Sequence, residues 1–289
     1  MSQPYERACI VGVGLLGASL GLALKQRGLA RQVTGVGHRQ ASLDVALERG
    51  AIDTAFLDAA EGARDADLVV LATPASLVIP MMDAVGPVCP DAVVTDVAST
   101  KAAICAHADA TWPAPRRFIG SHPMAGSEKF GAEHGTPDLY AGSVCLVETG
   151  DGLDPAARAA VAALWTAVGA EAVDVAPEAH DAMLACTSHL PHIVAAAVAR
   201  VADRRGDVRK LVGNGYRDTT RIAEGRPEIW RDICLTNREA ILAGLDELRA
   251  LLESEFTAAL RAGDGAGLER FFEEGRDARQ RAVGKEGGA

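Results

Sequence analysis

The chain has 289 residues, of which 48% are hydrophobic and 24% charged, which is enough for two domains around a substantial core. Its formal net charge of −10 argues against a nucleic-acid or anionic-membrane surface, because both attract basic proteins. The six cysteines form no CxxC pair, which favours reduced thiols in the cytoplasm over a metal or disulfide framework.

Two uncharged runs raise the question of targeting. The run 8–24 leads into Lys25 without a small-residue cleavage site, so it does not predict a signal peptide. The run 68–82 is too short to cross a bilayer and contains two prolines. We therefore expect a soluble, cytoplasmic protein without a targeting segment.

Short β-branched runs alternate with amphipathic segments over residues 1–176. Gly28 and Gly50 follow two of these segments, where they suit the ends of helices. Strands that are apolar almost throughout, alternating with helices, predict an α/β fold with a parallel, doubly wound sheet. The predicted strands cover residues 8–13, 32–36, 67–72, 92–98, 117–120, 143–148 and 171–176.

The strand signal stops after Pro177. Residues 178–204 and 227–262 each predict one long helix, and residues 268–283 predict a last one. We therefore predict a dinucleotide-binding sheet domain over residues 1–176 and a helical substrate and dimerisation domain over residues 177–289. The run IVAAAVARVA is apolar over more of its circumference than a surface helix needs, which favours a homodimer formed through the helical domain.

The sequence GVGLLG, from Gly12 to Gly17, follows the first predicted strand and begins a predicted helix. Gly12 permits a tight turn, Gly14 lets a pyrophosphate approach the backbone, and Gly17 allows the helix to pack closely on the strand. The start of the helix, at Leu15 and Leu16, offers backbone N–H groups to the phosphates. Glycines also mark ordinary turns, but this strand–turn–helix context indicates a dinucleotide site in a Rossmann-type domain.

Polar residues directly follow three later predicted strands. Because the carboxyl ends of parallel strands share one edge of a sheet, we expect these residues beside the dinucleotide turn, with the first pair assigned to the cofactor. His122 is a candidate for proton transfer, since histidine titrates near neutral pH, although a loop carbonyl would also satisfy its ring. For Ser99 the alternative is an N-cap of the following helix. The three segments are Thr73-Pro74, Ala98-Ser99-Thr100 and Ser121-His122-Pro123.

A second polar group lies in the predicted helix 178–204. His189 and His192 are three residues apart and share a helix face, and Pro191 interrupts the backbone hydrogen bonds there. The HxxH spacing can hold zinc, but neither an HExxH motif nor paired cysteines support a metal site. Further on, Arg221 is a candidate because it borders apolar residues, whereas a charged run usually forms a solvated face. The segment 217–233 also contains Arg217, Arg226 and Arg231.

Together these motifs resemble those of the prephenate/arogenate (cyclohexadienyl) dehydrogenases, the oxidoreductases of tyrosine biosynthesis. The resemblance spans residues 8–233 in the family's order, and the combination is far more specific than the glycine motif alone. The matching pieces are GVGLLG, LATP, DVASTK, GSHPMAGSE, PEAHD with SHLPH, and RDTTRIAEG with RPEIWRDI.

The resemblance implies a reaction. In the family, hydride leaves C4 of a cyclohexadiene for the nicotinamide, the histidine of the GSHP motif takes the C4 hydroxyl proton, and the ring carboxylate departs as CO2. This implies that His122 is the general base, that Ser99 orients it near the nicotinamide, and that Arg221 pairs with a substrate carboxylate. Further positions matching the substrate side are Ser127, Glu128, His189, His192 and Trp230.

The cofactor and substrate are less sharply defined. NAD-preferring members of the family often carry Asp at about Gly37, whose carboxylate would accept a hydrogen bond from the ribose 2′-hydroxyl. In this sequence His38 and Arg39 follow instead and are suited to a 2′-phosphate, which favours NADP over NAD. Arg39 stacked on the adenine would serve either cofactor. The sequence does not separate prephenate from arogenate, which differ in a keto or amino side chain.

Two other functions remain open. β-Hydroxyacid dehydrogenases share the sheet-plus-helices plan and use a lysine in a GxxxKxxxN pattern, which Gly206, Lys210 and Asn214 match. Those residues lie in a break rich in glycine and charge, whereas that family needs its lysine within a long helix. A non-catalytic dinucleotide sensor is the second alternative, but it would not need a base, an orienting serine and a carboxylate-binding arginine together.

Overall fold

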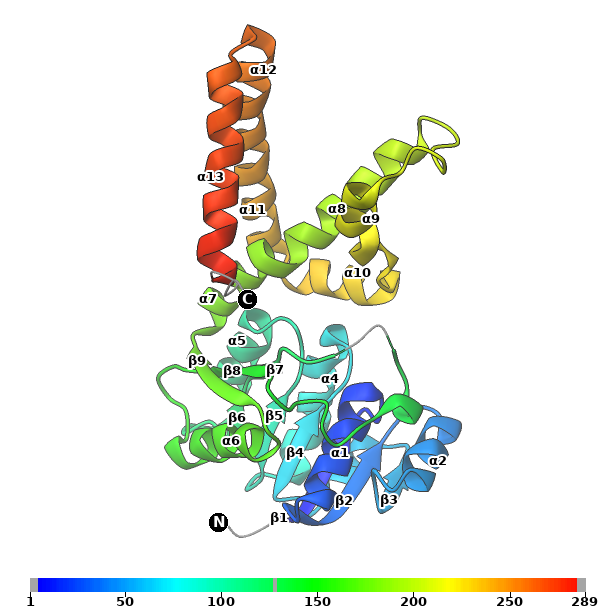
Figure 1. Ribbon diagram of the computed structural model, residues 1–289. Coiled ribbons are helices and arrows are strands. Elements are labelled where there is room, and N and C mark those ends of the chain that lie inside the picture. The colour runs from blue at the N-terminus through cyan, green and yellow to red at the C-terminus, as the bar shows by residue number, and fades with distance from the viewer. Residues whose placement is uncertain (1–4, 127–128, 285–289) are drawn as a thin grey trace. The chain divides into compact units, whose positions relative to one another are not determined.

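The structure is a computed structural model that describes residues 5–126 and 129–284. The chain divides into two compact units, residues 1–238 and 239–289, and each is described by itself (Figure 1). The predicted domain boundary between residues 176 and 177 falls inside the first unit and stays a prediction.

Strands alternate with helices as far as β6, and β7 and β8 then follow without an α-helix between them. After residue 175 the described chain is helical. The strands are β1 (Tyr5–Val11), β2 (Ala30–Val36), β3 (Thr54–Phe56), β4 (Leu68–Leu71), β5 (Val93–Asp96), β6 (Phe118–Ile119), β7 (Ser121–Pro123), β8 (Val144–Glu148) and β9 (Glu171–Val175). The α-helices are α1 (Leu15–Gln26), α2 (Gln40–Glu48), α3 (Ala59–Ala63), α4 (Ala75–Val85), α5 (Ala102–Thr111), α6 (Pro155–Ala167), α7 (Pro177–Leu184), α8 (Leu190–Asp203), α9 (Asn214–Thr220), α10 (Pro227–Thr236), α11 (Arg238–Leu251), α12 (Ala258–Ala262) and α13 (Gly265–Val283).

Six strands form a parallel sheet in the order β3-β2-β1-β4-β5-β6, which confirms the predicted doubly wound fold. Successive residues of β1 enter opposite cores: Ala8 and Ile10 face one, and Cys9 and Val11 face the other. Both faces of the sheet are therefore buried. This is why the strands are apolar throughout instead of alternating with polar residues.

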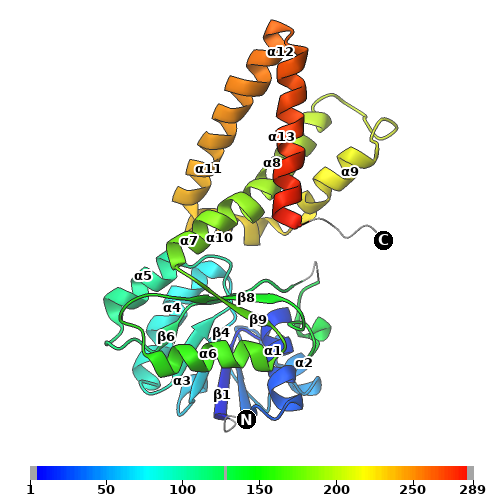
Figure 2. The same ribbon diagram turned by 60° about the vertical axis from the view of Figure 1, so that its left-hand side comes forward.

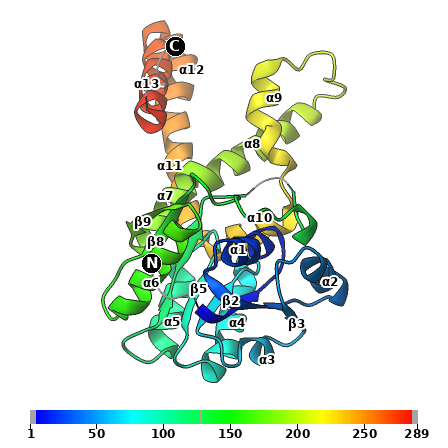
Figure 3. The same cartoon turned by 60° about the horizontal axis from the view of Figure 1, so that its bottom comes forward.

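Helices cover both faces of this sheet. Figure 3 shows α1 and α2 on the opposite side of the strands from α3 and α4. Leu24 of α1 and Trp165 of α6 lie in the first core, while Met82 of α4 and Ile104 of α5 lie in the second. Each such side chain is almost fully buried, and burying one contributes about 1.5–3 kcal/mol to stability.

The last three strands form a second sheet that the sequence analysis did not separate from the first. Its order is β7-β8-β9, with β7 antiparallel and β9 parallel to β8. Figure 2 shows β8 and β9 of this sheet beside each other. Gly120 lies where the chain passes from one sheet to the other. A Cβ at Gly120 would lie 2.8 Å from the sulfur of Cys105, and its N–H donates to the Glu148 carboxylate over 2.7 Å. The structure also adds β3, whose three half-buried residues gave no strand signal.

The predicted helix over residues 178–204 is present as α7, a π-helical turn at Ala185–His189, and α8. The π-helical turn comes just before Pro191, which lacks an N–H and disturbs the regular hydrogen-bond ladder. By length and composition alone, Pro177–Asp203 is the one helix of the described chain that could cross a membrane. Its polar residues nevertheless find partners within the first unit, as described below.

The predicted single helix over residues 227–262 is wrong, because the chain breaks between α10 and α11. Asn237 at the break is buried, and its side-chain amide donates to the carbonyl of Asp181, a contact that no local pattern reveals. In the second unit, α13 packs against the π-helical turn Leu252–Thr257. The rings of Phe256 and Phe271 meet there with centroids 5.2 Å apart.

The three glycines of the turn between β1 and α1 have different surroundings. Gly12 has a φ of +105°, and a Cβ on it would lie 2.4 Å from the carbonyl oxygen of Ala72. A Cβ on Gly17 would lie 1.9 Å from the carbonyl oxygen of Gly12. An added Cβ on Gly14 has nothing within 4 Å. Packing therefore requires Gly12 and Gly17, whereas Gly14 borders open space at the N-terminus of α1.

We predict that Gly17→Ala lowers the free energy of unfolding by about 1–3 kcal/mol, because the methyl group meets backbone that must shift. The matched control is Gly14→Ala, which places the same methyl group in open space and should cost about 0.5–1 kcal/mol, the difference between Gly and Ala at an N-cap. Urea unfolding of the two variants and the wild type measures both values. Equal losses in the two variants would contradict this account of the turn.

Candidate active site

The candidate site lies at the carboxyl edge of the main sheet. β1, β4, β5 and β6 are parallel, so the segments that follow them share this edge (Figure 1). These segments are the glycine turn, Thr73-Pro74, the stretch from Ala98 to Thr100, and Gly120, which leads into β7. In open α/β sheets this edge is where ligands bind.

The residues at this edge fit a dinucleotide. Gly14 is the N-cap residue of α1, and among the described residues no side chain caps that helix, so its first N–H groups are free for a phosphate. Leu15 and Leu16 are the first residues of α1. Thr73 holds a buried hydroxyl that lacks a hydrogen-bond partner in the described chain, as expected of a group that meets a ligand.

The neighbouring turns complete this edge. Pro74 precedes α4 as its N-cap residue. His38 and Arg39 are exposed directly after β2, and Arg39 is the N-cap residue of α2. Both side chains stand in the turn where dinucleotide-binding sheets recognise the ribose.

His122 is the central residue of β7, and its neighbour Ser121 fixes that strand to the main sheet. The Ser121 backbone N–H donates to the Asp96 carboxylate over 3.0 Å, and its hydroxyl donates to the Asp96 carbonyl over 2.5 Å. The same hydroxyl accepts from the Trp165 indole over 3.0 Å and lies 2.8 Å from the hydroxyl of Thr95. The backbone that carries His122 is therefore held rigidly at the end of β5.

The ring of His122 belongs to a buried chain of hydrogen bonds. Its Nδ1 lies 2.9 Å from Nε2 of His180, and Nδ1 of His180 lies 2.8 Å from the Asp181 carboxylate. That carboxylate also accepts from the backbone N–H groups of Lys101 and Ala102, over 2.7 and 3.0 Å, at the start of α5. All three side chains of the chain are at most 7% exposed. Neither His180 nor Asp181 was assigned a role from the sequence, although two adjacent polar residues in an apolar helix were a signal.

A buried ion pair lies beside this chain. The Lys101 ammonium and the Asp96 carboxylate form a salt bridge in which both side chains are almost fully buried. Burial lowers the pKa of His122 well below its usual value of 6.5, and the nearby His180, Lys101 and His189 lower this pKa further. His122 is therefore neutral at physiological pH and able to accept a proton.

Ser99 is half-buried and lies in the segment between β5 and α5. The alternative that it caps α5 is wrong, because the N-cap residue is Lys101 and the Asp181 carboxylate binds the first N–H groups. Among the hydrogen bonds of the described residues, none joins Ser99 to His122. Its orienting role therefore stays a prediction.

His189, His192 and Trp230 lie together. The His192 ring stacks on Trp230 with centroids 3.6 Å apart, and the His189 ring meets the same indole edge-on at 6.3 Å. The Asn237 amide nitrogen donates to the Asp181 carbonyl, which fixes the amide's orientation, and it lies 3.1 Å from Nδ1 of His189. Nδ1 of His189 is therefore an acceptor, and the ring proton is on Nε2. Nε2 of His189 is buried and has no hydrogen-bond partner in the described chain.

The remaining predicted residues are less constrained. Arg221 is exposed and begins the 3-10 turn Arg221–Glu224 after α9. Ser127 and Glu128 lie outside the described residues. Lys210, from the alternative GxxxKxxxN pattern, is exposed in a turn between α8 and α9 and not in a helix.

Nothing in the histidine geometry favours zinc. Nδ1 of His192 lies 3.0 Å from the carbonyl of Ser188, and Nδ1 of His189 faces an amide. Within residues 5–126 and 129–284, no group of three His, Cys, Asp or Glu side chains is arranged to hold a metal ion.

α10 connects this cluster to the cofactor edge. The Ser76 hydroxyl in the first turn of α4 donates to the Asp232 carboxylate over 2.6 Å, and Thr100 donates to Thr236 over 3.0 Å. Both contacts join segments more than 130 residues apart in the chain. The helix that carries Trp230 is thus attached to the first turn of α4 and to the segment between β5 and α5.

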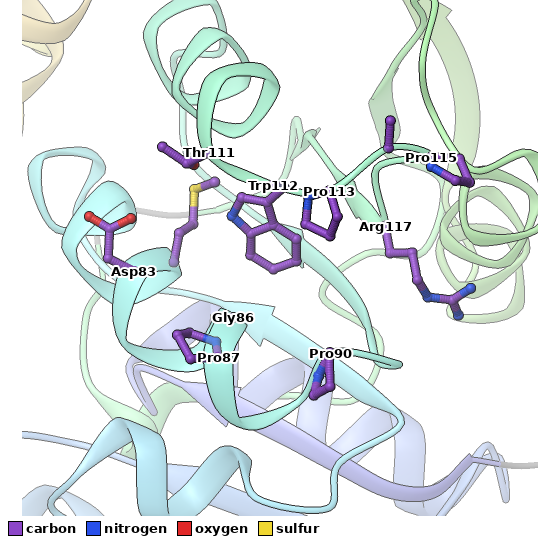
Figure 4. Close-up of a pocket in the computed structure, with 11 residues that line it drawn as sticks. Asp83, Gly86, Pro87, Pro90, Thr111, Trp112, Pro113, Pro115 and Arg117 are labelled. Atoms are coloured by element: carbon purple, nitrogen blue, oxygen red, sulfur yellow. The ribbon is translucent and has the colours of Figure 1, made fainter.

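A separate pocket of about 370 Å³ lies away from these residues (Figure 4). Trp112 and several prolines line it, between the ends of α4 and α5 and the starts of β5 and β6. The amino ends of the strands lie there, opposite to the edge that carries the glycine turn. Its charged residues already have partners, since Asp83 pairs with His107 and Arg117 pairs with Asp154, each over 2.8 Å.

Comparison with known proteins identifies the family. Residues 20–174 match the model of the prephenate dehydrogenase nucleotide-binding domain, and residues 176–274 match that of the prephenate dehydrogenase dimerization domain. The chain belongs to the prephenate dehydrogenase family. The glycine turn at residues 12–17 precedes the first match, so its structure is independent support for a nucleotide site.

Individual relatives extend over nearly the whole chain. Prephenate dehydrogenase of Bacillus subtilis (strain 168) is 31% identical over 96% of this chain and 76% of its own length. Cyclohexadienyl dehydrogenase of Zymomonas mobilis is 29% identical over 95% of both chains. Among solved structures, A. aeolicus prephenate dehydrogenase in complex with hydroxyphenyl propionate and NAD+ has a TM-score of 0.89 and 28% identity, covering 98% of this chain and 100% of its own. Synechocystis arogenate dehydrogenase has a TM-score of 0.83 and 30% identity, covering 96% and 99%.

We predict that this prephenate dehydrogenase family member loses stability as the pH falls from 6.5 to about 4. Burial lowers the pKa of His189 from 6.5 to about 4, so over this range the unfolded chain takes up a proton that the folded protein does not. Such a shift corresponds to about 3 kcal/mol in the free energy of unfolding. Above pH 6.5 His189 is neutral in both the folded and the unfolded state, so this loss of stability is absent.

Urea unfolding across this pH range in the wild type and in His189→Asn tests the prediction, because the variant lacks the titrating group and should lose stability less steeply. The control is His134→Asn at an exposed histidine, whose pH slope should equal that of the wild type. An unchanged slope in His189→Asn would show that the residue does not titrate as described.

Proposed function

We propose that this protein catalyses the oxidative decarboxylation of prephenate or arogenate, with hydride transfer to NAD(P)+, giving 4-hydroxyphenylpyruvate or tyrosine. The observation that carries the proposal is His122, a buried neutral base held by His180 at the sheet edge that bears the glycine turn. Membership of the prephenate dehydrogenase family supports it. Relatives named prephenate, cyclohexadienyl and arogenate dehydrogenase support the same reaction on either substrate.

His122 performs the proton transfer in this proposal. A bound nicotinamide would supply the hydride acceptor for C4 of the cyclohexadiene. His122 accepts the C4 hydroxyl proton, so that the oxygen becomes a carbonyl as C4 is oxidised. The ring carboxylate leaves as CO2, its bonding electron pair makes the ring aromatic, and His122 returns the proton to the same oxygen. The histidine ends as it began, neutral.

The cofactor is assigned to the glycine turn and its neighbours. Gly14 and the N-terminus of α1 at Leu15 and Leu16 would hold the pyrophosphate, and Thr73, followed by Pro74, would donate its unpaired hydroxyl. Ser99, on the same edge, is assigned to orient the base and the nicotinamide.

The substrate is assigned to the polar cluster of the helical segment. His189 offers a buried Nε2–H without a partner in the described chain, which suits a carboxylate or carbonyl oxygen of the substrate. Arg221 would pair with a substrate carboxylate through its guanidinium fork. The stacked rings of His192 and Trp230 would form an aromatic surface beside the bound substrate. Ser127 and Glu128 are assigned to the same site from the resemblance alone.

We predict that the purified protein reduces NAD(P)+ and releases CO2 with prephenate, arogenate or both. His122→Asn should lower kcat by about 10²–10⁴-fold with little change in substrate KM, since general-base catalysis contributes on that order. Arg221→Gln should instead raise KM more than it lowers kcat, because the carboxylate that it binds is charged before and during the reaction. Steady-state kinetics measures both.

The contrast between these two variants is the informative result. A His122→Asn enzyme with near-normal kcat would disprove the assigned mechanism. Absence of turnover with both substrates and both cofactors would disprove the proposed function itself.

For the cofactor, we propose NADP over NAD. The support is the turn after β2, where exposed His38 and Arg39 stand and Gly37 carries no carboxylate to repel a 2′-phosphate. Gly37 also packs closely, because a Cβ there would lie 3.2 Å from Leu43, so an acidic side chain would require Leu43 to move. The structure of the A. aeolicus relative contains NAD+, and this observation concerns the cofactor of that relative alone.

We predict that Arg39→Ala lowers kcat/KM for NADP+ by about tenfold or more, the loss of a charge-assisted phosphate contact, and leaves NAD+ kinetics almost unchanged. The measurement is the ratio of kcat/KM for the two cofactors in wild type and variant. Arg31→Ala, at an exposed arginine at the other end of β2 paired with Glu6, is the control. A wild-type preference for NAD+ that Arg39→Ala does not alter would refute the assignment.

We also propose a homodimer formed through the helical region and a cytoplasmic location. Residues 176–274 match a domain described as a dimerization domain, and of α8 only Ala195 is buried although the helix is rich in alanine and valine. The six cysteines are all free, as is usual in a reducing compartment.

A further inference from the structure

We propose that Asp181 and His180 are positioning residues that fix the proton of neutral His122 on Nδ1 and so leave Nε2 as the nitrogen available to the substrate. The inference rests on the proposed function only in naming a substrate hydroxyl as the source of the proton. It concerns which of two ring nitrogens is basic, a property of the free protein that can be measured without turnover.

The Asp181 carboxylate is surrounded by hydrogen-bond donors. One of its oxygens accepts hydrogen bonds from the Lys101 backbone N–H over 2.7 Å and from Nδ1 of His180 over 2.8 Å. The other accepts from the Ala102 N–H over 3.0 Å. A carboxylate surrounded by N–H donors is ionised and can only accept, so Nδ1 of His180 must carry a proton.

The proton on Nδ1 of His180 in turn determines what its Nε2 can do toward His122. A neutral imidazole that is protonated on Nδ1 has an unprotonated Nε2, which can only accept. Nε2 of His180 lies 2.9 Å from Nδ1 of His122. His122 must therefore donate from Nδ1, and its own lone pair is on Nε2. Through two successive hydrogen bonds, the negative charge of Asp181 thus determines which nitrogen of His122 carries the proton.

The hydrogen bonds from His122 through His180 to Asp181 also stabilise the protonated state of His122. When Nε2 takes the substrate proton, Nδ1–H remains directed at an acceptor, so the imidazolium keeps its hydrogen bond in a buried site. The charged groups around the ring are the Lys101 ammonium, paired with Asp96, and the Asp181 carboxylate beyond His180. An oriented histidine backed by a buried aspartate is the same solution that serine proteases use for their base.

The first test is 15N NMR of the uniformly labelled free protein at neutral pH. Nitrogen chemical shifts and couplings to ring protons identify which nitrogen of each histidine bears the proton, with His122→Asn and His180→Gln used for assignment. We expect protonated Nδ1 and bare Nε2 in both His122 and His180. If His180 were charged it would donate to His122 and place the His122 proton on Nε2, and that result would overturn the proposal.

The second test compares two substitutions of His180. His180→Leu removes the acceptor and should lower kcat by about 10²-fold or more with little change in KM, as when a base loses its oriented partner. His180→Gln places an amide oxygen near the former Nε2, so it should retain much more of kcat and keep the His122 proton on Nδ1. Because Asp181 also caps α5, Asp181→Asn is a weaker probe than either.

The surface pair of His107 and Asp83, joined over 2.8 Å, provides the matched control. His107→Leu removes a histidine from a histidine–aspartate pair outside the site and should leave kcat, KM and the His122 tautomer unchanged. Near-normal kcat in a folded His180→Leu protein would refute the proposal, as would equal losses in His180→Leu and His180→Gln. If neither prephenate nor arogenate is turned over, the NMR result still decides the tautomer, so the two proposals can fail separately.

Discussion

The Asp181 carboxylate is the junction between the helical segment and the edge of the main sheet. It accepts two backbone N–H groups at the start of α5, which would otherwise be unsatisfied, and its negative charge faces the positive end of that helix. Only 4% of the residue is exposed, so three N–H donors replace the water that the carboxylate has lost. Without them a buried charge would be strongly destabilising. The carboxylate that joins the helical segment to α5 therefore also orients the His180 ring toward His122.

The second sheet explains how a histidine comes to be held at this junction. A doubly wound sheet alone would follow β6 with a loop or a helix. Here Gly120 directs the chain into β7, whose Ser121 binds the end of β5 through both backbone and hydroxyl. His122 pairs with Leu146 in the middle of this three-residue strand. A base on a strand is placed more exactly than one on a free loop, which suits a reaction that needs the proton acceptor and the hydride acceptor together.

Sequence reasoning predicted the sheet, the glycine turn and the alignment of polar residues at strand ends, because each follows from a local pattern of a few residues. It did not predict the second sheet, β3 or the break at Asn237. The contacts that organise the site join residues far apart in the chain: His122 to His180 across 58 positions, and Lys101 to Asp181 across 80. No periodicity reports such pairings. What the sequence did offer was a polar His-Asp pair at the start of an apolar helix, and only the fold gives that pair its role.

Two buried histidines of the site have opposite proton placement, and the reason is the chemistry of their partners. His122 faces an acceptor, so its Nδ1 is protonated and its Nε2 can take a proton. His189 faces the amide nitrogen of Asn237, so its Nδ1 accepts and its Nε2–H can only donate. Burial lowers the pKa of both rings, which keeps them neutral and preserves this difference at physiological pH. A substrate with a hydroxyl to deprotonate and a carboxylate to bind needs one ring of each kind. Asp181 contributes to both, through its carboxylate toward His180 and through its carbonyl toward Asn237.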